Sequence, residues 1–271
     1  MPELPEVETT LRGIEPHILN LPIKRISIRE SKLRWKVPEK ELKKNLLGNN
    51  FLSIKRRAKY LILNSNKGSL LIHLGMSGSL RILFEEVKPQ KHDHIDIVFK
   101  NNCLLRFTDP RKFGSFLWSK DPEVHPLLKD LGPEPLGNSF SGEYLFQVSR
   151  KRKVPLKNFI MNAKVLAGVG NIYASEALFL AGIRPQKRAG NISSKQYDLL
   201  AFSIKELLQN SIDKGGTTLK DFVGSDSKPG YFKNELMVYG RAGKACKECS
   251  SHLKEIRLSQ RSSVYCPKCQ A

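Results

Sequence analysis

The first residues of the chain could carry out nucleophilic chemistry. The chain opens with the sequence MPELPE, and removal of Met1 would leave the ring nitrogen of Pro2 as a free secondary amine. An α-amino group has a pKa of about 7.7 to 8.0, so a fraction of it is neutral and nucleophilic near pH 7. Its attack on a carbonyl or a sugar C1′ would give an iminium ion, and Glu3 and Glu6 are close enough in sequence to move protons for it. An N-terminal proline is usually incidental, however, so this interpretation needs support from other residues.

Four of the five cysteines have the spacing of a metal site. They lie near the C-terminus as Cys246-x2-Cys249-x16-Cys266-x2-Cys269, and the span between the pairs is long enough for a β-hairpin that completes a tetrahedron around zinc. Two disulfides are the alternative, but no secretory signal indicates an oxidising compartment. Four thiolates leave no open position on the metal, so we expect one structural Zn²⁺. The fifth cysteine, Cys103, lies in an apolar run and is expected to be a buried small hydrophobe.

The composition indicates a polyanionic partner. The chain of 271 residues has 46 Lys and Arg against 26 Asp and Glu, a formal net charge of +20, which exceeds what solubility requires and favours nucleic acid. A ribosome-associated or merely basic protein is the alternative. The hydrophobic fraction of 40% can form a core in each of two domains. No apolar run approaches the roughly 20 residues that span a bilayer, and we expect a cytoplasmic protein.

The N-terminal amine must be positioned by the elements that follow it. Apolar residues at helical spacing predict an amphipathic helix over residues 3–19, whose N-terminal dipole favours Glu3 and Glu6. Short apolar runs separated by turn residues then predict strands, at 23–28, 60–63, 70–73, 79–84, 95–99, 104–107 and 113–118. Many short strands without intervening helices indicate a β-sandwich.

The second half of the chain changes to helical periodicity. A stretch rich in proline and glycine, 132–137, is the candidate hinge. Helices are predicted beyond it, at 144–148, 156–165, 171–181 and 197–212. A loop rich in Gly, Ser and Lys, 215–230, then leads to the cysteines. The predicted fold class is therefore α+β with more than one domain.

Seven short segments form one ordered pattern along the chain. They are PELPEVET (2–9), RRAKYL (56–61), HLGMSG (73–78), KHDH (91–94), TDPRKFG (108–114), GVGNIY (168–173) and the four-cysteine finger. Any one of them could occur by chance, whereas all seven in this order could not. The pattern resembles the formamidopyrimidine-DNA glycosylases, also called 8-oxoguanine DNA glycosylase/AP lyases, and the resemblance covers essentially the whole chain.

The resemblance implies a fold, a division into domains and a partner. The implied fold is an N-terminal β-sandwich preceded by a helix, then a helical domain of the helix-two-turn-helix type with a four-cysteine β-hairpin zinc finger. We expect a catalytic domain at 1–133, a linker at 134–152, a helical DNA-binding domain at 153–236 and the finger at 237–271. The implied partner is double-stranded DNA with an oxidised purine or an abasic site, bound by a monomer that acts at the bacterial nucleoid.

The resemblance also implies catalytic roles. The amine of Pro2 would attack C1′ of the damaged nucleoside and expel the base, and the Schiff base would make the C2′ proton acidic, so that β,δ-elimination cuts the strand. Glu3 matches the residue that protonates the sugar ring oxygen, and Glu6 either serves as a second carboxylate or caps the helix. Lys59 matches the proton donor in β-elimination. Arg261 matches the arginine linked to δ-elimination, where it would bind the 3′ phosphate.

Three further residues match those that fill the void left by an extruded nucleotide. Met76 would insert as a flexible apolar wedge, Arg111 would hydrogen-bond the orphaned cytosine, and Phe113 would wedge a base step. For Met76, ordinary core packing is the alternative. The loop at 215–230 resembles the family's mobile loop over the extruded base.

Phosphate contacts are expected in both halves of the chain. His92 and Lys151 match DNA-contacting positions, although the basic run around Lys151 could be a solvated linker. Asn171 would lie at a helix N-terminus where a phosphate can dock, and Lys157 is another matched polar position. His92 and His94 share one face of a strand but lack a third ligand, so a metal site there is not expected.

One departure from the family pattern concerns the first cysteine pair. The family usually has a glycine after Cys249, where this chain has Ser250 and Ser251, which places the turn of the first knuckle in question. The small residue that usually follows the finger arginine is Ser262 here.

Two other readings of the chain remain. Endonuclease VIII shares the proline chemistry and the finger but acts on oxidised pyrimidines, and the start of this chain together with Met76, Arg111 and Phe113 favours the purine enzyme. The other reading is a noncatalytic zinc-finger DNA-binding protein, in which Pro2 is incidental.

Overall fold

The structure is a computed structural model, and it describes residues 2–216 and 235–271. The described residues fall into two compact units. The N-terminal unit comprises 2–129 with 214–216, and the C-terminal unit comprises 130–213 with 235–271. Among these residues, no helix combines the length and the apolar character that crossing a membrane would require. The finer division into a linker, a helical domain and a finger stays a prediction.

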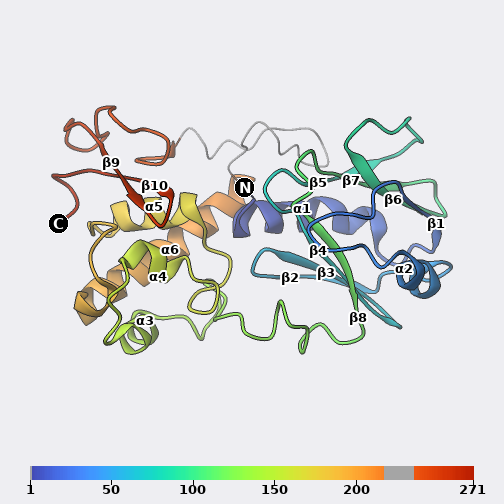
Figure 1. The fold of residues 1–271 in the computed structure, drawn as a ribbon, viewed down its shortest axis with the longest axis horizontal. Helices are drawn as coiled ribbons and strands as arrows, with labels where there is room; N and C mark the ends of the chain where they lie inside the picture. Colours follow the sequence, from blue (N-terminus) through green and yellow to red (C-terminus); the bar gives the residue numbers. More distant parts are fainter. Residues whose placement is uncertain (1, 217–234) are drawn as a thin grey trace. The chain divides into compact units, whose positions relative to one another are not determined.

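The N-terminal unit begins with the predicted amphipathic helix, α1 (Leu4–Ile18). Its apolar residues recur every three or four positions, so they share one face, which is buried in the core of the unit. That face comprises Val7, Leu11, Ile14 and Ile18. Pro5 lies in the first turn, where its missing N–H leaves no hydrogen bond unmade. Figure 1 shows α1 in blue beside the strands of this unit.

Two four-stranded sheets of antiparallel neighbours make up the rest of the N-terminal unit. In the order of their pairing, the first contains β2 (Ser53–Arg57), β3 (Tyr60–Ser65), β4 (Gly68–His73) and β8 (Ser115–Ser119). The second contains β1 (Ile23–Ile28), β6 (Asp93–Phe99), β7 (Leu104–Thr108) and β5 (Ser79–Leu83). Apolar side chains of both sheets join one core, which also includes Cys103. The predicted β-sandwich and the buried cysteine are confirmed.

Two elements of this unit lie outside the sequence prediction. The helix α2 (Glu39–Leu46) has the sequence EKELKKNL, in which only Leu42 and Leu46 are buried. The strand β2 buries only Ile54 and is otherwise basic or polar. Both elements were missed because too few of their positions are apolar to give a periodic signal.

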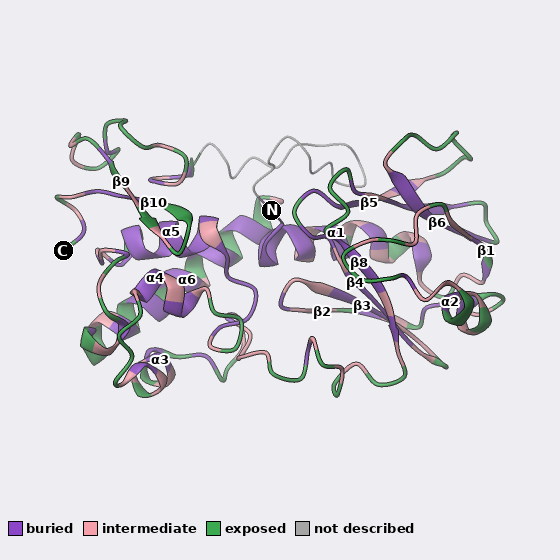
Figure 2. Ribbon diagram, in the orientation of Figure 1, coloured by how far each residue is buried: buried purple, intermediate pink, exposed green. Residues whose placement is uncertain are grey.

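The C-terminal unit is helical, with α3 (Gly142–Ser149), α4 (Leu156–Ile160), α5 (Asn171–Leu180) and α6 (Ser194–Asp213). A short 3₁₀ helix, η1 (Ala189–Asn191), precedes α6. The helix α5 is buried along almost its whole length, as Figure 2 shows in purple. The helix predicted over 156–165 ends early, because the Asn162 side chain accepts the Lys164 N–H at 3.0 Å and forms a turn instead.

The cysteine segment folds as the predicted hairpin. Its strands β9 (Lys254–Leu258) and β10 (Arg261–Tyr265) pair in antiparallel register. The two turn residues, Ser259 and Gln260, both have positive φ, 45° and 62°. That is the geometry of the tight hairpin turn that matches the twist of the strands, although glycine or asparagine usually provides it.

Candidate functional site

The residues expected to do chemistry lie at the start of α1. Pro2, Glu3 and Glu6 are all buried, and the two glutamates are 1% and 2% exposed. The Glu3 N–H donates to Glu6 Oε2 at 2.8 Å, which forms half of a capping box at the helix N-terminus. Glu6 therefore has the helix-capping role that the sequence left open. The positive end of the helix dipole favours both carboxylates there.

The loop predicted to cover an extruded base begins beside this group. A Cβ built on Gly216 would lie 3.2 Å from Glu6 Oε1, so the backbone of the loop's first residues packs against Glu6. Gly216 has φ +81°, a conformation that favours glycine. Residues 217–230 of this predicted loop lie outside the described residues.

Lys59 lies in the two-residue turn between β2 and β3, where Arg57 pairs with Tyr60. The other turn residue, Ala58, has φ 54° and is buried. Arg56 ties this turn to α1, because its guanidinium donates to Glu8 at 2.9 Å and to the Ala58 carbonyl at 3.1 Å. The predicted lyase lysine is therefore held on a strained turn that is fixed to the helix starting near Pro2.

His73 is a candidate site residue that the sequence reasoning missed. Its Nδ1 accepts the Gly75 N–H at 2.9 Å, and its ring lies 4.7 Å from that of Tyr60. Burial, together with the positive charges of Lys59 and Arg34, lowers the pKa of His73 to about 4. The imidazole is therefore neutral at pH 7, and Nε2 carries its proton. Its place in the segment HLGMSG was the only signal in the sequence.

Two exposed side chains project from neighbouring turns of the N-terminal unit. Met76 is 41% exposed and Phe113 is 42% exposed, and the Arg111 guanidinium lies 4.9 Å from the centre of the Phe113 ring. The turns are in direct backbone contact, because a Cβ on Gly75 would lie 2.4 Å from the Phe113 carbonyl carbon. Core packing, the alternative for Met76, is therefore wrong.

His92 and His94 differ in their surroundings. His92 is partly exposed, whereas His94 is buried and its Nε2 lies 2.7 Å from the Asp109 carbonyl oxygen. A carbonyl can only accept, so that nitrogen is protonated and is not a metal ligand. Across the described residues, the four cysteines form the one cluster with metal-site geometry.

The four cysteines fit one tetrahedral metal ion. Their Sγ atoms all lie within 4.8 Å of one another, with Cys246 and Cys269 3.9 Å apart and Cys249 and Cys266 3.4 Å apart. Tetrahedral zinc with Zn–S bonds of about 2.3 Å separates its sulfurs by roughly 3.8 Å, whereas a disulfide bond is about 2.05 Å long. The site is therefore a structural zinc site, and the disulfide alternative is wrong.

The departure after Cys249 is accommodated without glycine. Ser250 has φ 61°, in the region that favours glycine, and its N–H donates to the Cys246 carbonyl at 3.0 Å. The Cys246 N–H in turn donates to the Ser251 carbonyl at 2.9 Å. The knuckle turn forms, and Ser250 bears the conformational cost that glycine would avoid.

The hairpin that carries Arg261 is anchored by α4. Lys157 is 1% exposed, and its Nζ donates to the Ser262 carbonyl at 2.9 Å and to Ser263 Oγ at 2.8 Å. The Asn158 side chain also donates to Ser259 Oγ in the hairpin turn. A cavity of about 210 Å³ lies between α4 and the hairpin, and Arg261 lines it. The contact of Lys157 with DNA stays a prediction, while these bonds assign its ammonium to the finger.

Two other candidates occupy distinct positions in the C-terminal unit. Lys151 is exposed, with φ 62°. Asn171 begins α5 after Gly170, as predicted, and its side-chain Oδ1 is buried with no hydrogen-bond partner among the described residues. A buried polar atom without a partner is unusual in a folded protein and is consistent with a partner that the substrate supplies.

Glu176, on α5, is a second residue that the sequence reasoning missed. It is 2% exposed and accepts three successive backbone N–H groups, from Met237 at 2.7 Å, Val238 at 2.9 Å and Tyr239 at 2.7 Å. Burial raises its pKa, although these three donors act in the opposite direction. Glu176 therefore fixes the segment that leads into the finger.

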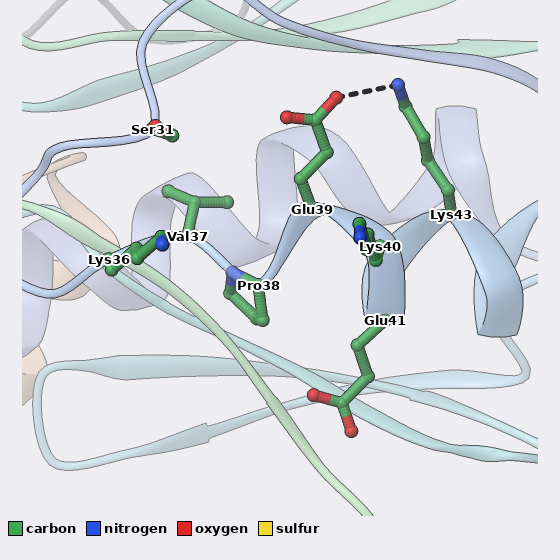
Figure 3. Close-up of a pocket in the computed structure, with 8 residues that line it drawn as sticks. All are labelled: Ser31, Lys36, Val37, Pro38, Glu39, Lys40, Glu41 and Lys43. Carbon is green, nitrogen blue, oxygen red and sulfur yellow. Dashed lines mark hydrogen bonds and ion pairs between the residues drawn. The ribbon is translucent and has the colours of Figure 1, made fainter.

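A larger hollow of about 790 Å³ lies elsewhere, at the start of α2 (Figure 3). Its lining carries both charge signs, including an ion pair of 2.7 Å between Glu39 and Lys43. It contains none of the predicted site residues, so its size does not make it the site.

Three family models match the chain. The formamidopyrimidine-DNA glycosylase N-terminal domain matches residues 1–116, and the H2TH domain of the same enzymes matches residues 131–223. The zinc finger found in FPG and IleRS matches residues 243–271.

Whole-chain relatives agree with these matches. Proteins named formamidopyrimidine-DNA glycosylase from Psychromonas ingrahamii and Pseudomonas aeruginosa are 56% and 55% identical to this chain, and each alignment covers 100% of both chains. A mutant of the Lactococcus lactis FPG, solved with DNA containing Fapy-dG, is 35% identical with a TM-score of 0.92 and 99% of both chains covered. MutM (FPG) from Thermus thermophilus is 33% identical with a TM-score of 0.89, covering 99% of this chain and 98% of that one.

Proposed function

The chain belongs to the formamidopyrimidine-DNA glycosylase family and is a DNA glycosylase of base excision repair, and we propose that it removes oxidised purines and cuts the strand through a covalent bond between Pro2 and deoxyribose. The observation that carries this proposal is the group at the start of α1. There a buried proline precedes two buried carboxylates at the positive end of a helix.

The first step joins the enzyme to the sugar. The amine of Pro2, free once Met1 is removed, attacks C1′ while the bond from C1′ to the damaged base breaks and the base leaves with a proton. Glu3 protonates the sugar ring oxygen, so the ring opens to an iminium ion. Glu6 orients this end of the helix, because its carboxylate is bonded to the Glu3 N–H.

Elimination then cuts the strand. The iminium acidifies the C2′ proton, and its removal expels the 3′ phosphate, with Lys59 as the proton donor. In the δ-elimination that follows, loss of the C4′ proton expels the second phosphate from C5′, which becomes the 3′ phosphate of the upstream strand. Arg261 binds this phosphate and stabilises its charge as it leaves, which suits a guanidinium that stays protonated. Water finally hydrolyses the iminium and restores the Pro2 amine.

Access to the base requires its extrusion from the duplex, at a cost of a few kcal/mol. We propose that Met76 and Phe113 enter the stack and that Arg111 hydrogen-bonds the orphaned cytosine. Their exposure on two turns in backbone contact supports this role, because an apolar wedge must be both projecting and firmly held.

Backbone phosphates would be held by residues of both units. His92, Lys151 and Asn171 are the proposed contacts, and the unpartnered Asn171 Oδ1 supports the last of them. The net charge of +20 implies that binding weakens steeply as salt is raised. We propose that the protein acts as a monomer on bacterial DNA in the cytoplasm.

Reductive trapping tests the proposal. A duplex with one 8-oxoguanine opposite cytosine is incubated with the protein and borohydride, and a covalent adduct is expected. Pro2→Gly should form on the order of 100-fold less adduct, the scale on which loss of a positioned catalytic group is felt. Pro89→Gly, an exchange in an exposed loop of the same unit, is the matched control and should trap normally.

The outcomes separate the candidate functions. No adduct with matured wild-type protein would favour a noncatalytic DNA-binding protein. Faster trapping on an oxidised pyrimidine than on 8-oxoguanine would instead assign the specificity of endonuclease VIII.

A further inference from the structure

We infer that Asp109 is a positioning residue that fixes the positions of Met76, Arg111 and Phe113 relative to one another. This inference rests on the proposed void-filling function of those three residues. Asp109 directly follows β7, and it is 0% exposed. A carboxylate removed from water needs hydrogen-bond donors around it. Its donors come from the two turns that carry the three exposed side chains.

The carboxylate of Asp109 bonds both turns at once. Its Oδ1 accepts from Ser77 Oγ at 2.7 Å and from the Arg111 N–H at 3.2 Å. Its Oδ2 accepts from the Gly114 N–H at 2.7 Å. Ser77 directly follows Met76 in the chain, and Gly114 directly follows Phe113. One side chain therefore sets the position of the residue next to each apolar wedge and of the arginine backbone between them.

The backbone of Asp109 extends the same connection. Its N–H donates to the His92 carbonyl at 3.0 Å, and its carbonyl accepts from His94 Nε2 at 2.7 Å and from the Lys112 N–H at 3.3 Å. The backbone of His92, a proposed phosphate contact, is thus hydrogen-bonded to the same residue that holds the turns of Met76 and Phe113. Lys112, between Arg111 and Phe113, has φ 56°, so this turn is strained and needs such bonds to persist.

The two turns are also packed closely against each other and against the core. A Cβ on Gly114 would lie 2.5 Å from the Phe107 ring and 3.1 Å from Asp109 Oδ2. With Gly75 in contact with the Phe113 backbone, neither turn can shift without moving the other. The carboxylate therefore acts on all three void-filling side chains together, and none of them needs to contact it directly.

Two variants test the inference. Asp109→Asn keeps the shape but replaces one acceptor oxygen with an NH₂ group, which would face an N–H or O–H donor. Ser77→Ala is milder, because it removes one donor to the carboxylate and one acceptor for the Arg111 N–H at 3.2 Å. Asp130→Asn is the matched control, since Asp130 is exposed and pairs only loosely with Lys164, at 3.5 Å.

The measurements separate base excision from lyase chemistry. Excision of 8-oxoguanine opposite cytosine from a duplex should fall on the order of 100-fold in Asp109→Asn and about tenfold in Ser77→Ala, because small misplacements are costly. Cleavage of a single-stranded oligonucleotide with a preformed abasic site, which has no void to fill, should change by no more than about threefold. Asp130→Asn should change neither activity.

Equal loss of both activities would show a general structural role and overturn the inference, as would unchanged duplex excision in both variants. Amide hydrogen exchange provides a test that does not depend on activity. The Arg111 and Gly114 amides should lose protection in Asp109→Asn while those of β6 keep theirs. If wild-type protein lacks both activities, the proposed function has failed, and this exchange pattern decides whether Asp109 holds the turns.

Discussion

The turns of the N-terminal unit and the finger of the C-terminal unit both carry exposed residues that we propose contact DNA, but the two regions are stabilised by different means. The turns of Met76 and Phe113 extend from a sandwich of two four-stranded sheets with a large apolar core. The finger has one two-stranded hairpin and a small apolar cluster built around its cysteines. A core that small cannot stabilise a fold by burial alone, so the metal must supply what the sheets supply elsewhere.

The two regions also bury charges of opposite sign to position backbone. In the N-terminal unit, the Asp109 carboxylate collects N–H and O–H donors from two turns. In the C-terminal unit, the Lys157 ammonium donates to a carbonyl and a hydroxyl of β10. Each buried charge fixes a segment with an exposed arginine, Arg111 or Arg261. Removing the Asp109 charge should therefore misplace the Arg111 guanidinium, although the carboxylate bonds only the Arg111 backbone N–H. Removing the Lys157 charge should misplace Arg261.

Loss of the metal should have the largest effect and should be confined to one region. Cys266→Ala removes a zinc ligand, and structural zinc in finger peptides contributes about 10 to 16 kcal/mol of binding free energy at pH 7. We expect β9 and β10 to lose amide protection and δ-elimination to be lost with the placement of Arg261. Both tryptophans, Trp35 and Trp118, belong to the N-terminal unit, so the unfolding midpoint from their fluorescence should not change.

The control for this prediction is the fifth cysteine. Cys103→Ala should keep one zinc per chain in a colorimetric assay but lower the tryptophan midpoint, because Cys103 lies in the sandwich core. If Cys266→Ala shifts the tryptophan midpoint as much as Cys103→Ala does, the two regions are not stabilised independently.

Replacing the buried Lys157 should have a smaller effect on the finger than losing the metal. Lys157→Met leaves the Ser262 carbonyl and Ser263 Oγ without their donor, which should destabilise the hairpin by about 1 to 3 kcal/mol. The share of δ-elimination product should fall relative to β-elimination product, whereas borohydride trapping through Pro2 should persist. The measurement is the product ratio on an abasic duplex, with the exposed Lys195→Met as the control from the same unit.

The same variant distinguishes the two roles for Lys157. A direct phosphate contact predicts weaker DNA binding and a shallower salt dependence, with the exchange of β10 amides unchanged. Faster exchange in β10 with an unchanged salt dependence assigns the lysine to the finger.

The sequence predicted those parts of the fold whose signal is local. The helix α1, the strands of the sandwich other than β2 and the zinc ligands follow from apolar spacing and cysteine spacing alone. The helix α2 and the strand β2 could not be predicted in this way, because each has too few apolar residues to give a periodic pattern. These few residues are buried only by their packing in the folded sandwich.

The residues of the candidate site also differ in whether their roles could be predicted from the sequence. Exposed residues such as Met76 and Arg111 lie in recognisable segments, so they could be singled out from the sequence. The positioning roles of Asp109, Lys157 and Glu176 could not be predicted, because they depend on partners that are distant in the chain. Lys157 was singled out from the sequence, but as a DNA contact. A buried charge in a sequence is indistinguishable from an exposed one until its partners are known.

The smallest predicted effect is a pH dependence confined to the N-terminal unit. His73 has a pKa of about 4 in the folded protein, against about 6.5 in an unfolded chain. Between these values the unfolded state binds the extra proton, so stability falls as pH falls, by at most about 1.4 kcal/mol per pH unit. In His73→Asn, whose amide oxygen can still accept the Gly75 N–H, this contribution should vanish. Urea unfolding followed by tryptophan fluorescence at pH 5 and pH 7 measures the difference, and equal pH dependence in the two proteins would contradict a neutral, buried His73.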